Sequence, residues 1–165
     1  MALIVEDGTG RSDAESYASV AQADARLAAL GMTTWASNTV TLEREQALRR
    51  ATEYMEQRYR SQWKGTKLLR AQALSWPRYG AQADGYSIDS TVVPTDIVNA
   101  CIDLAFKAAQ GDLNADVTRT VIREKVGPLE TEYAPHGPQS TQYRSIDMAL
   151  APYLGGGGMN RLARA

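Results

Sequence analysis

Apolar residues at helical spacing predict two helices in the first sixty residues. Ser19 and Gln22 form a capping box that begins the first helix, and Gly31 ends it. Its apolar positions are Val20, Ala23, Leu27 and Leu30. The second helix is predicted over 41–60, with Thr41 as its cap and acidic residues in the first turn, where the helix dipole favours anions. Its apolar stripe consists of Leu48, Ala51, Met55 and Tyr59.

The helical pattern is lost between Trp63 and Val93, where glycines, a proline and large aromatic residues are concentrated. They are Trp63, Gly65, Trp76, Pro77, Tyr79, Gly80 and Gly85. A flexible linker would not contain two tryptophans, so we predict an ordered but irregular connection. Pro94 then opens a helix that ends at Gly111 and is expected to be the most buried one. One of its faces carries Ile97, Cys101, Leu104, Ala105 and Ala108.

A β-hairpin is predicted near 117–133, because a β-branched run is followed by a Gly127-Pro128 turn and an alternating strand. Basic residues of the first arm are expected to face acidic residues of the second, at roughly 0.2–1 kcal/mol per pair. These are Arg119, Arg123 and Lys125 on one arm and Glu130 and Glu132 on the other. Because a two-stranded hairpin is marginal in water, it must pack on the helices or pair with another chain.

A short helix capped by Ser145 and a glycine-rich tail complete the chain. Residues 155–165 are predicted to be a flexible tail that either docks on a partner or has no role. Its docking candidates are Met159, Arg161, Leu162 and Arg164. With 165 residues, of which 44% are hydrophobic, the remaining 1–154 suffice for one domain. The predicted fold class is mainly α, a small helical bundle with an irregular Trp-rich connection and one β-hairpin.

Charge is balanced overall but not along the chain. The net charge is −1, which disfavours a protein that wraps nucleic acid through its overall field. Residues 44–78 carry nine basic and three acidic residues, whereas 1–43 carry two basic and six acidic ones. Two interpretations are equally open: surfaces that meet complementary partners, or a basic helix face balanced by acidic neighbours within the same fold.

Residues with recognisable catalytic or ligand chemistry are scarce. One cysteine, Cys101, and one histidine, His136, cannot supply a structural zinc site or an internal disulfide. No nucleophile motif accompanies His136, and Cys101 is assigned to the core. Gly65-Thr66-Lys67 lacks the order and spacing of a phosphate loop. We therefore expect no enzyme activity, metal or cofactor. The lack of an apolar run of 18 residues or a signal peptide also predicts neither membrane insertion nor secretion.

One segment, 58–64, interleaves basic and aromatic residues in a way that suits single-stranded nucleic acid, because rings stack on bases and cations neutralise phosphates. The alternative, which we favour, is that Tyr59 and Trp63 face the core while Arg58, Arg60 and Lys64 cover the rim.

Three groups of residues resemble the head-to-tail adaptor proteins of tailed bacteriophages. The first is Trp63-Lys64-Gly65 followed by the segment 72–78, which ends in Trp76-Pro77-Arg78. The second is Val93-Pro94 at the start of an alanine-rich helix, and the third combines 124–133 with 146–154. The resemblance covers roughly residues 15 to 155.

The resemblance implies a structural protein of the virion neck. Such an adaptor forms a ring, most often twelvefold, between the portal and a stopper or tail-completion protein, and DNA passes through the ring. It would be assembled in the host cytoplasm. Some members of this grouping are described as DnaT-like single-stranded-DNA-binding proteins, which makes a DNA-binding module of phage replication the alternative function.

Interface candidates follow from this resemblance and from residue type. Trp63, Trp76, Pro77 and Arg78 combine aromatic and arginine side chains with a rigid proline, a composition favoured at interfaces. For Trp76 the other interpretation, a plug of the domain core, is equally open. Arg123, Lys125, Glu130 and Glu132 of the hairpin complete the set.

Overall fold

The computed structural model describes residues 2–37, 40–115, 121–125, 130–133 and 141–155. Its α-helices are α1 (Val20–Ala29), α2 (Thr33–Ser37), α3 (Thr41–Tyr59), α4 (Thr95–Ala108) and α5 (Arg144–Leu150), followed by the 3₁₀ helix η1 (Ala151–Tyr153). The strands are β1 (Thr66–Lys67), β2 (Arg78–Tyr79), β3 (Gln82–Ala83), β4 (Tyr86–Ser87), β5 (Val121–Lys125) and β6 (Glu130–Tyr133). The predicted mainly α fold class is confirmed. Within the described ranges, no helix has the length and apolarity needed to cross a membrane.

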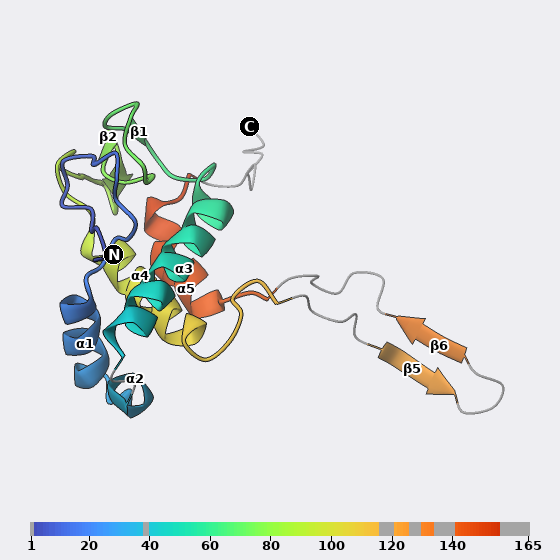
Figure 1. Cartoon of the computed structure of the whole chain (residues 1–165). Coiled ribbons are helices and arrows are strands. Elements are labelled where there is room, and N and C mark those ends of the chain that lie inside the picture. Colours follow the sequence, from blue (N-terminus) through green and yellow to red (C-terminus); the bar gives the residue numbers. More distant parts are fainter. Residues whose placement is uncertain (1, 38–39, 116–120, 126–129, 134–140, 156–165) are drawn as a thin grey trace, which may run out of the picture.

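The centre of the bundle is the packing of α3 against α4 (Figure 1). All five residues predicted for the apolar face of α4 are buried, and Ala100 and Ile102 widen that face. Cys101 lies fully inside, where its Sγ is 3.4 Å from Thr52 Oγ1 and burial raises the pKa of the thiol. Its assignment to the core is confirmed, as is the prediction that α4 is the most buried helix.

The helix starts differ in how well local sequence signals predict them. Ser19 and Gln22 form the predicted capping box of α1. The predicted caps of the other two helices are wrong by one or two residues, because the first turn begins earlier than the sequence suggests. Val40 precedes α3 and its carbonyl accepts from Glu43 N, so Thr41 is already helical. Tyr143 precedes α5 in the same way, and Ser145 lies inside the helix.

Two core segments were not predicted. In the N-terminal stretch before α1, Ser16, Tyr17 and Ala18 are buried among the helices although the stretch has no helical or alternating period. The short helix α2 buries Trp35, whose indole Nε1 donates to Asp24 Oδ1 at 2.7 Å. Both segments are held by tertiary contacts that leave no periodic pattern in the sequence.

The predicted hairpin is present as β5 and β6, and Figure 1 shows it standing apart from the helical body. Its register places Arg123 opposite Glu132 and Lys125 opposite Glu130, as expected from the sequence. A register shift between Val121 and Arg123 interrupts the ladder. Arg119 and the Gly127-Pro128 turn lie outside the described residues.

Candidate nucleic-acid interface at the hairpin end

The predicted irregular connection contains two small antiparallel hairpins, β1–β2 and β3–β4, at the end of the bundle where α3 ends (Figure 1). We call this region the hairpin end and define it as residues 60–70 and 78–87. Thr66 pairs with Tyr79 and Lys67 with Arg78 in the first hairpin. Gly65 adopts a φ of +73°, and a Cβ there would lie 2.5 Å from the Tyr79 carbonyl oxygen, so only glycine permits this close approach.

The interface candidates Trp63, Trp76, Pro77 and Arg78 are interior residues. Trp76 is completely buried, and its ring lies 5.9 Å from that of Trp63 and 6.1 Å from that of Tyr153, edge to face in both pairs. Of the two interpretations of Trp76, the structure shows the core plug. Tyr59 and Trp63 are buried as well, so the favoured interpretation of segment 58–64 is confirmed.

Arg78 binds the backbone of the hairpin end through its buried guanidinium. Its guanidinium donates to the carbonyl oxygens of Lys64 (2.7 Å), Gly65 (2.5 Å), Ser75 (3.1 Å) and Trp63 (3.4 Å). Burial lowers the pKa of this guanidinium. Arg78 therefore connects the end of α3 to β2. Its side chain stabilises the backbone of this region and exposes little surface to a partner.

A second buried connection fixes the loop before β2. The hydroxyl of Tyr17 donates to Glu56 Oε1 and accepts from the backbone N–H groups of Ser75 and Trp76 at 3.0 and 3.2 Å. Ser75 also donates its hydroxyl to Glu56 Oε2 at 2.7 Å. Burial and the neighbouring Glu56 carboxylate raise the pKa of Tyr17 well above its usual value. The N-terminal stretch, α3 and the connection are thereby locked together.

The hairpins present two tyrosines to solvent. Tyr79, opposite Thr66, is 68% exposed, and Tyr86 of β4 is 79% exposed. Sequence reasoning missed Tyr86 as a candidate, although Asp84-Gly85 is a hairpin-turn signal. Both turn residues have positive φ, 53° and 85°, and Ala83 pairs with Tyr86 across the turn. The signal was thus present but short, since each strand has only two residues.

Most arginines of the basic stretch 44–78 are used inside the fold. Arg44 pairs with Asp24 at 3.0 Å, Arg49 with Glu15 at 2.9 Å, and Arg58 with Asp147 at 3.2 Å. Arg58 also lies over the Tyr59 ring, 5.6 Å from its centroid. Of the two interpretations of the charge asymmetry, acidic neighbours within the same fold account for these three arginines.

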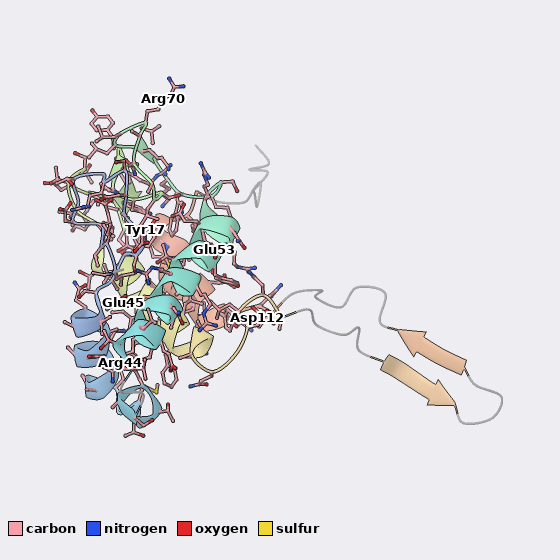
Figure 2. The ribbon with its side chains drawn as sticks, viewed as in Figure 1. Tyr17, Arg44, Glu45, Glu53, Arg70 and Asp112 are labelled. Atoms are coloured by element: carbon pink, nitrogen blue, oxygen red, sulfur yellow. The ribbon has the colours of Figure 1, made fainter. Side chains whose placement is uncertain are left out.

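Two exposed arginines at the hairpin end, Arg60 and Arg70, have no ion pair among the described residues. Arg70 occupies the turn closed by the Gln72 N–H to Leu69 carbonyl bond, and Figure 2 shows it pointing away from the body into solvent. Burial lowers the pKa of Lys67, the nearby Glu56 carboxylate opposes this shift, and the charges of Arg60 and Arg78 add to it. The positive charges of Arg60, Lys67 and Arg78 therefore lie close to one another at the hairpin end.

Two acidic residues of the N-terminal stretch, Glu6 and Asp13, are engaged by donors of the chain. Glu6 is buried and accepts from the N–H groups of Gly8, Gly10 and Arg11 at 2.9–3.0 Å. Asp13 pairs with Arg11 at 2.9 Å. From residue 60 to residue 87 the sequence has five basic residues and one acid, Asp84. Basic residues therefore outnumber acidic ones in this segment although the chain as a whole is nearly neutral.

The remaining predicted residues add nothing to this surface. Arg123, Lys125, Glu130 and Glu132 are placed only by their register in the β5–β6 hairpin. The tail residues Met159, Arg161, Leu162 and Arg164, and also His136, lie outside the described residues. Among the residues that the structure does describe, no group of three His, Cys, Asp or Glu side chains could hold a metal ion.

Comparison with known proteins corrects the adaptor resemblance. Residues 1–165 match one protein family, described as "Putative DnaT-like ssDNA binding protein". No curated protein matches the chain, and no solved structure does. The match supports none of the connector, neck or portal-binding roles.

The physical reason for the error is that the residues behind the resemblance, Trp63 and Trp76-Pro77-Arg78, build the interior. Similarity in buried residues indicates a similar fold, but one fold can have many functions, so these residues did not predict the function. By a match over all of its 165 residues, the chain belongs to the family of DnaT-like ssDNA binding proteins.

Proposed function

We propose that this chain is a non-enzymatic module that binds single-stranded DNA at its hairpin end. The observation that carries the proposal is the pair of exposed tyrosines, Tyr79 and Tyr86, on successive hairpins. The same end of the molecule contains Arg60 and Arg70, two exposed arginines without an ion pair among the described residues. Membership of a family described by ssDNA binding supports the same ligand.

The chemistry of single strands fits these residues. Unpaired bases expose their faces, which stack on aromatic rings at about 1–3 kcal/mol per base, and cations beside the rings neutralise the phosphates. A tyrosine that is more than two thirds exposed can accept a base without any rearrangement of the fold. The tryptophans cannot, because they are buried in the interior.

The hairpins are favoured over the neighbouring surface of α3 as the path of the strand. An open hollow beside the last turns of α3 is lined by Glu53, Glu56, Gln57, Arg60 and Ser61. Its two carboxylates repel phosphates. We therefore assign the strand to the side of the two tyrosines, where residues 60 to 87 contain five basic residues and one acidic residue, Asp84.

The test is binding of a fluorescent oligodeoxythymidine, followed by anisotropy. Tyr79→Ala and Tyr86→Ala should each weaken binding by roughly 5- to 100-fold, since each removes one stacking platform. The matched variants Tyr79→Phe and Tyr86→Phe keep the ring and should bind within about twofold of the wild type. If the alanine variants bind as tightly as the phenylalanine variants, the tyrosines do not stack on bases and the proposal fails.

Salt dependence tests the arginines. For single strands, each phosphate contact contributes about 0.7 to the slope of log K against log salt. Arg70→Ala should therefore lower the slope by roughly that amount. Arg144→Ala is the control, because Arg144 is also exposed but lies at the start of α5, away from the hairpins. Equal slopes for both variants would exclude Arg70 as a phosphate contact.

A further inference from the structure

The β5–β6 hairpin is a two-stranded sheet that stands by itself among the described elements. Figure 1 shows it apart from the helical body, and no described helix packs extensively on either strand. A hairpin of two strands is marginally stable in water, and stability needs more strands or a helix against one face. Each strand also has a free edge, where backbone N–H and C=O groups can pair with another strand. The sheet is therefore incomplete within one copy of the chain.

The register of this hairpin places charges of opposite sign on its two strands. Arg123 of β5 lies opposite Glu132 of β6, and Lys125 lies opposite Glu130. Directly opposite residues belong to the same face of a sheet, so one face has two basic positions along β5 and two acidic positions along β6. The register shift lies before Arg123, so the ladder is regular where these four residues pair.

We propose that the free edge of β6 pairs with the free edge of β5 in a second copy of this chain. This pairing places the acidic positions of one copy beside the basic positions of the next. Pairing of two β5 edges or two β6 edges would instead place like charges opposite each other, which destabilises a sheet.

The partner strand comes from another copy because one chain cannot supply it. Within a copy, β5 and β6 already pair through their inner edges, and two strands cannot close into a barrel. The other described strands, β1 to β4, have only two residues each. A strand of a second copy has the required length and no proline, which would remove a donor from the new ladder.

The charges of the hairpin also make this edge selective. Residues 121–133 contain two basic and three acidic residues, so the hairpin has no excess positive charge for phosphates. Lysine on an edge strand discourages pairing with an arbitrary strand. An acidic strand such as β6 is therefore the partner that suits Lys125 and Arg123 of β5.

The proposed contact joins two different edges, so it is heterologous and each added copy again offers one free β5 edge and one free β6 edge. Copies are therefore expected to add one after another, with the sheet growing by two strands per copy. This association does not rest on the proposed DNA binding and is tested without DNA.

The test uses a charge-swapped chain that combines Arg123→Glu, Lys125→Glu, Glu130→Lys and Glu132→Lys. The swap keeps the net charge and every opposite-sign pair within the hairpin, so the hairpin should be as stable as in the wild type. Sedimentation velocity is measured up to roughly 0.5 mM, at low salt because salt screens surface charges. The average mass of each chain alone should rise with concentration beyond that of a dimer.

Mixing the two chains decides which edges meet. Labelled wild type at a low, fixed concentration is titrated with unlabelled wild type or with the unlabelled swapped chain. Binding to the swapped chain should be at least about 10-fold weaker, because a β6 to β5 contact between the two places like charges opposite each other. The control exchanges an exposed ion pair outside the hairpin, Arg11→Asp with Asp13→Arg, and should bind like the wild type.

Three results would overturn the proposal. The first is a wild-type chain that stays monomeric over this range. The second is a swapped chain that stays monomeric by itself, since its edges are as complementary as those of the wild type. The third is labelled wild type that binds the swapped chain as tightly as the wild type or more tightly, which is the result expected if like edges pair.

Discussion

Replacing Arg78 by alanine tests whether the hairpin end depends on a buried guanidinium. Arg78 is only 8% exposed and donates to four backbone carbonyl groups. A hydrogen bond to a charged group contributes about 1.5–3 kcal/mol, but bonds from one side chain are not additive, and desolvation of the guanidinium offsets part of them. We expect Arg78→Ala to lower the free energy of unfolding by about 3–5 kcal/mol, most of it from carbonyl groups left buried without a donor.

The assay is urea unfolding followed by tryptophan fluorescence, which is sensitive here because the Trp63 carbonyl oxygen accepts from Arg78 and the Trp63 ring packs against that of Trp76. For a chain of this size the loss corresponds to a melting temperature lower by roughly 6–20 °C. The free energy of unfolding of Arg78→Lys should lie between those of the wild type and Arg78→Ala, because an ammonium group cannot reproduce the planar set of donors of a guanidinium. Arg70→Ala, an exposed arginine of the same segment, is the control and should stay within about 0.5 kcal/mol of the wild type. An Arg78→Ala chain that unfolds within that same margin would refute the reasoning.

Three further predictions concern other parts of the fold. Gly8→Ala should destabilise by several kcal/mol, because φ is +99° and the added Cβ would lie 1.9 Å from the Thr91 carbonyl oxygen; thermal unfolding measures this. Burial and the hydrogen bond to Asp96 raise the pKa of Tyr153 from 10.0 to about 12, so the unfolded chain loses this proton first and stability falls as pH rises through that window. Tyr153→Phe should show a shallower fall between pH 10 and 12, and an unchanged slope would contradict the assignment. Because Cys101 is buried, it should react with a thiol reagent only as fast as the chain opens. A reaction rate in the folded protein equal to that in the urea-unfolded protein would contradict this prediction.

Sequence alone determined those features whose signals are local. The capping box at Ser19 was sufficient to place the start of α1, because both hydrogen-bonding partners lie within one turn. The apolar period of α4 identified its buried face, Cys101 included. Alternation after a glycine-proline turn was enough to predict that basic residues of one hairpin arm face acidic residues of the other, as Arg123 faces Glu132. Each of these is a statement about neighbours along the chain, and neighbours are what a sequence displays.

Tertiary structure alone decided which of several chemically similar residues are available to a ligand. Tyr59, Trp63 and Tyr79 are all aromatic residues near basic ones, yet only Tyr79 lies at the surface, because it follows the buried Arg78 on a two-residue strand. Arg58 and Arg60 are two positions apart, yet Arg58 is paired with Asp147, 89 residues away. Burial and long-range pairing depend on how distant segments pack, and no period in the sequence encodes that packing.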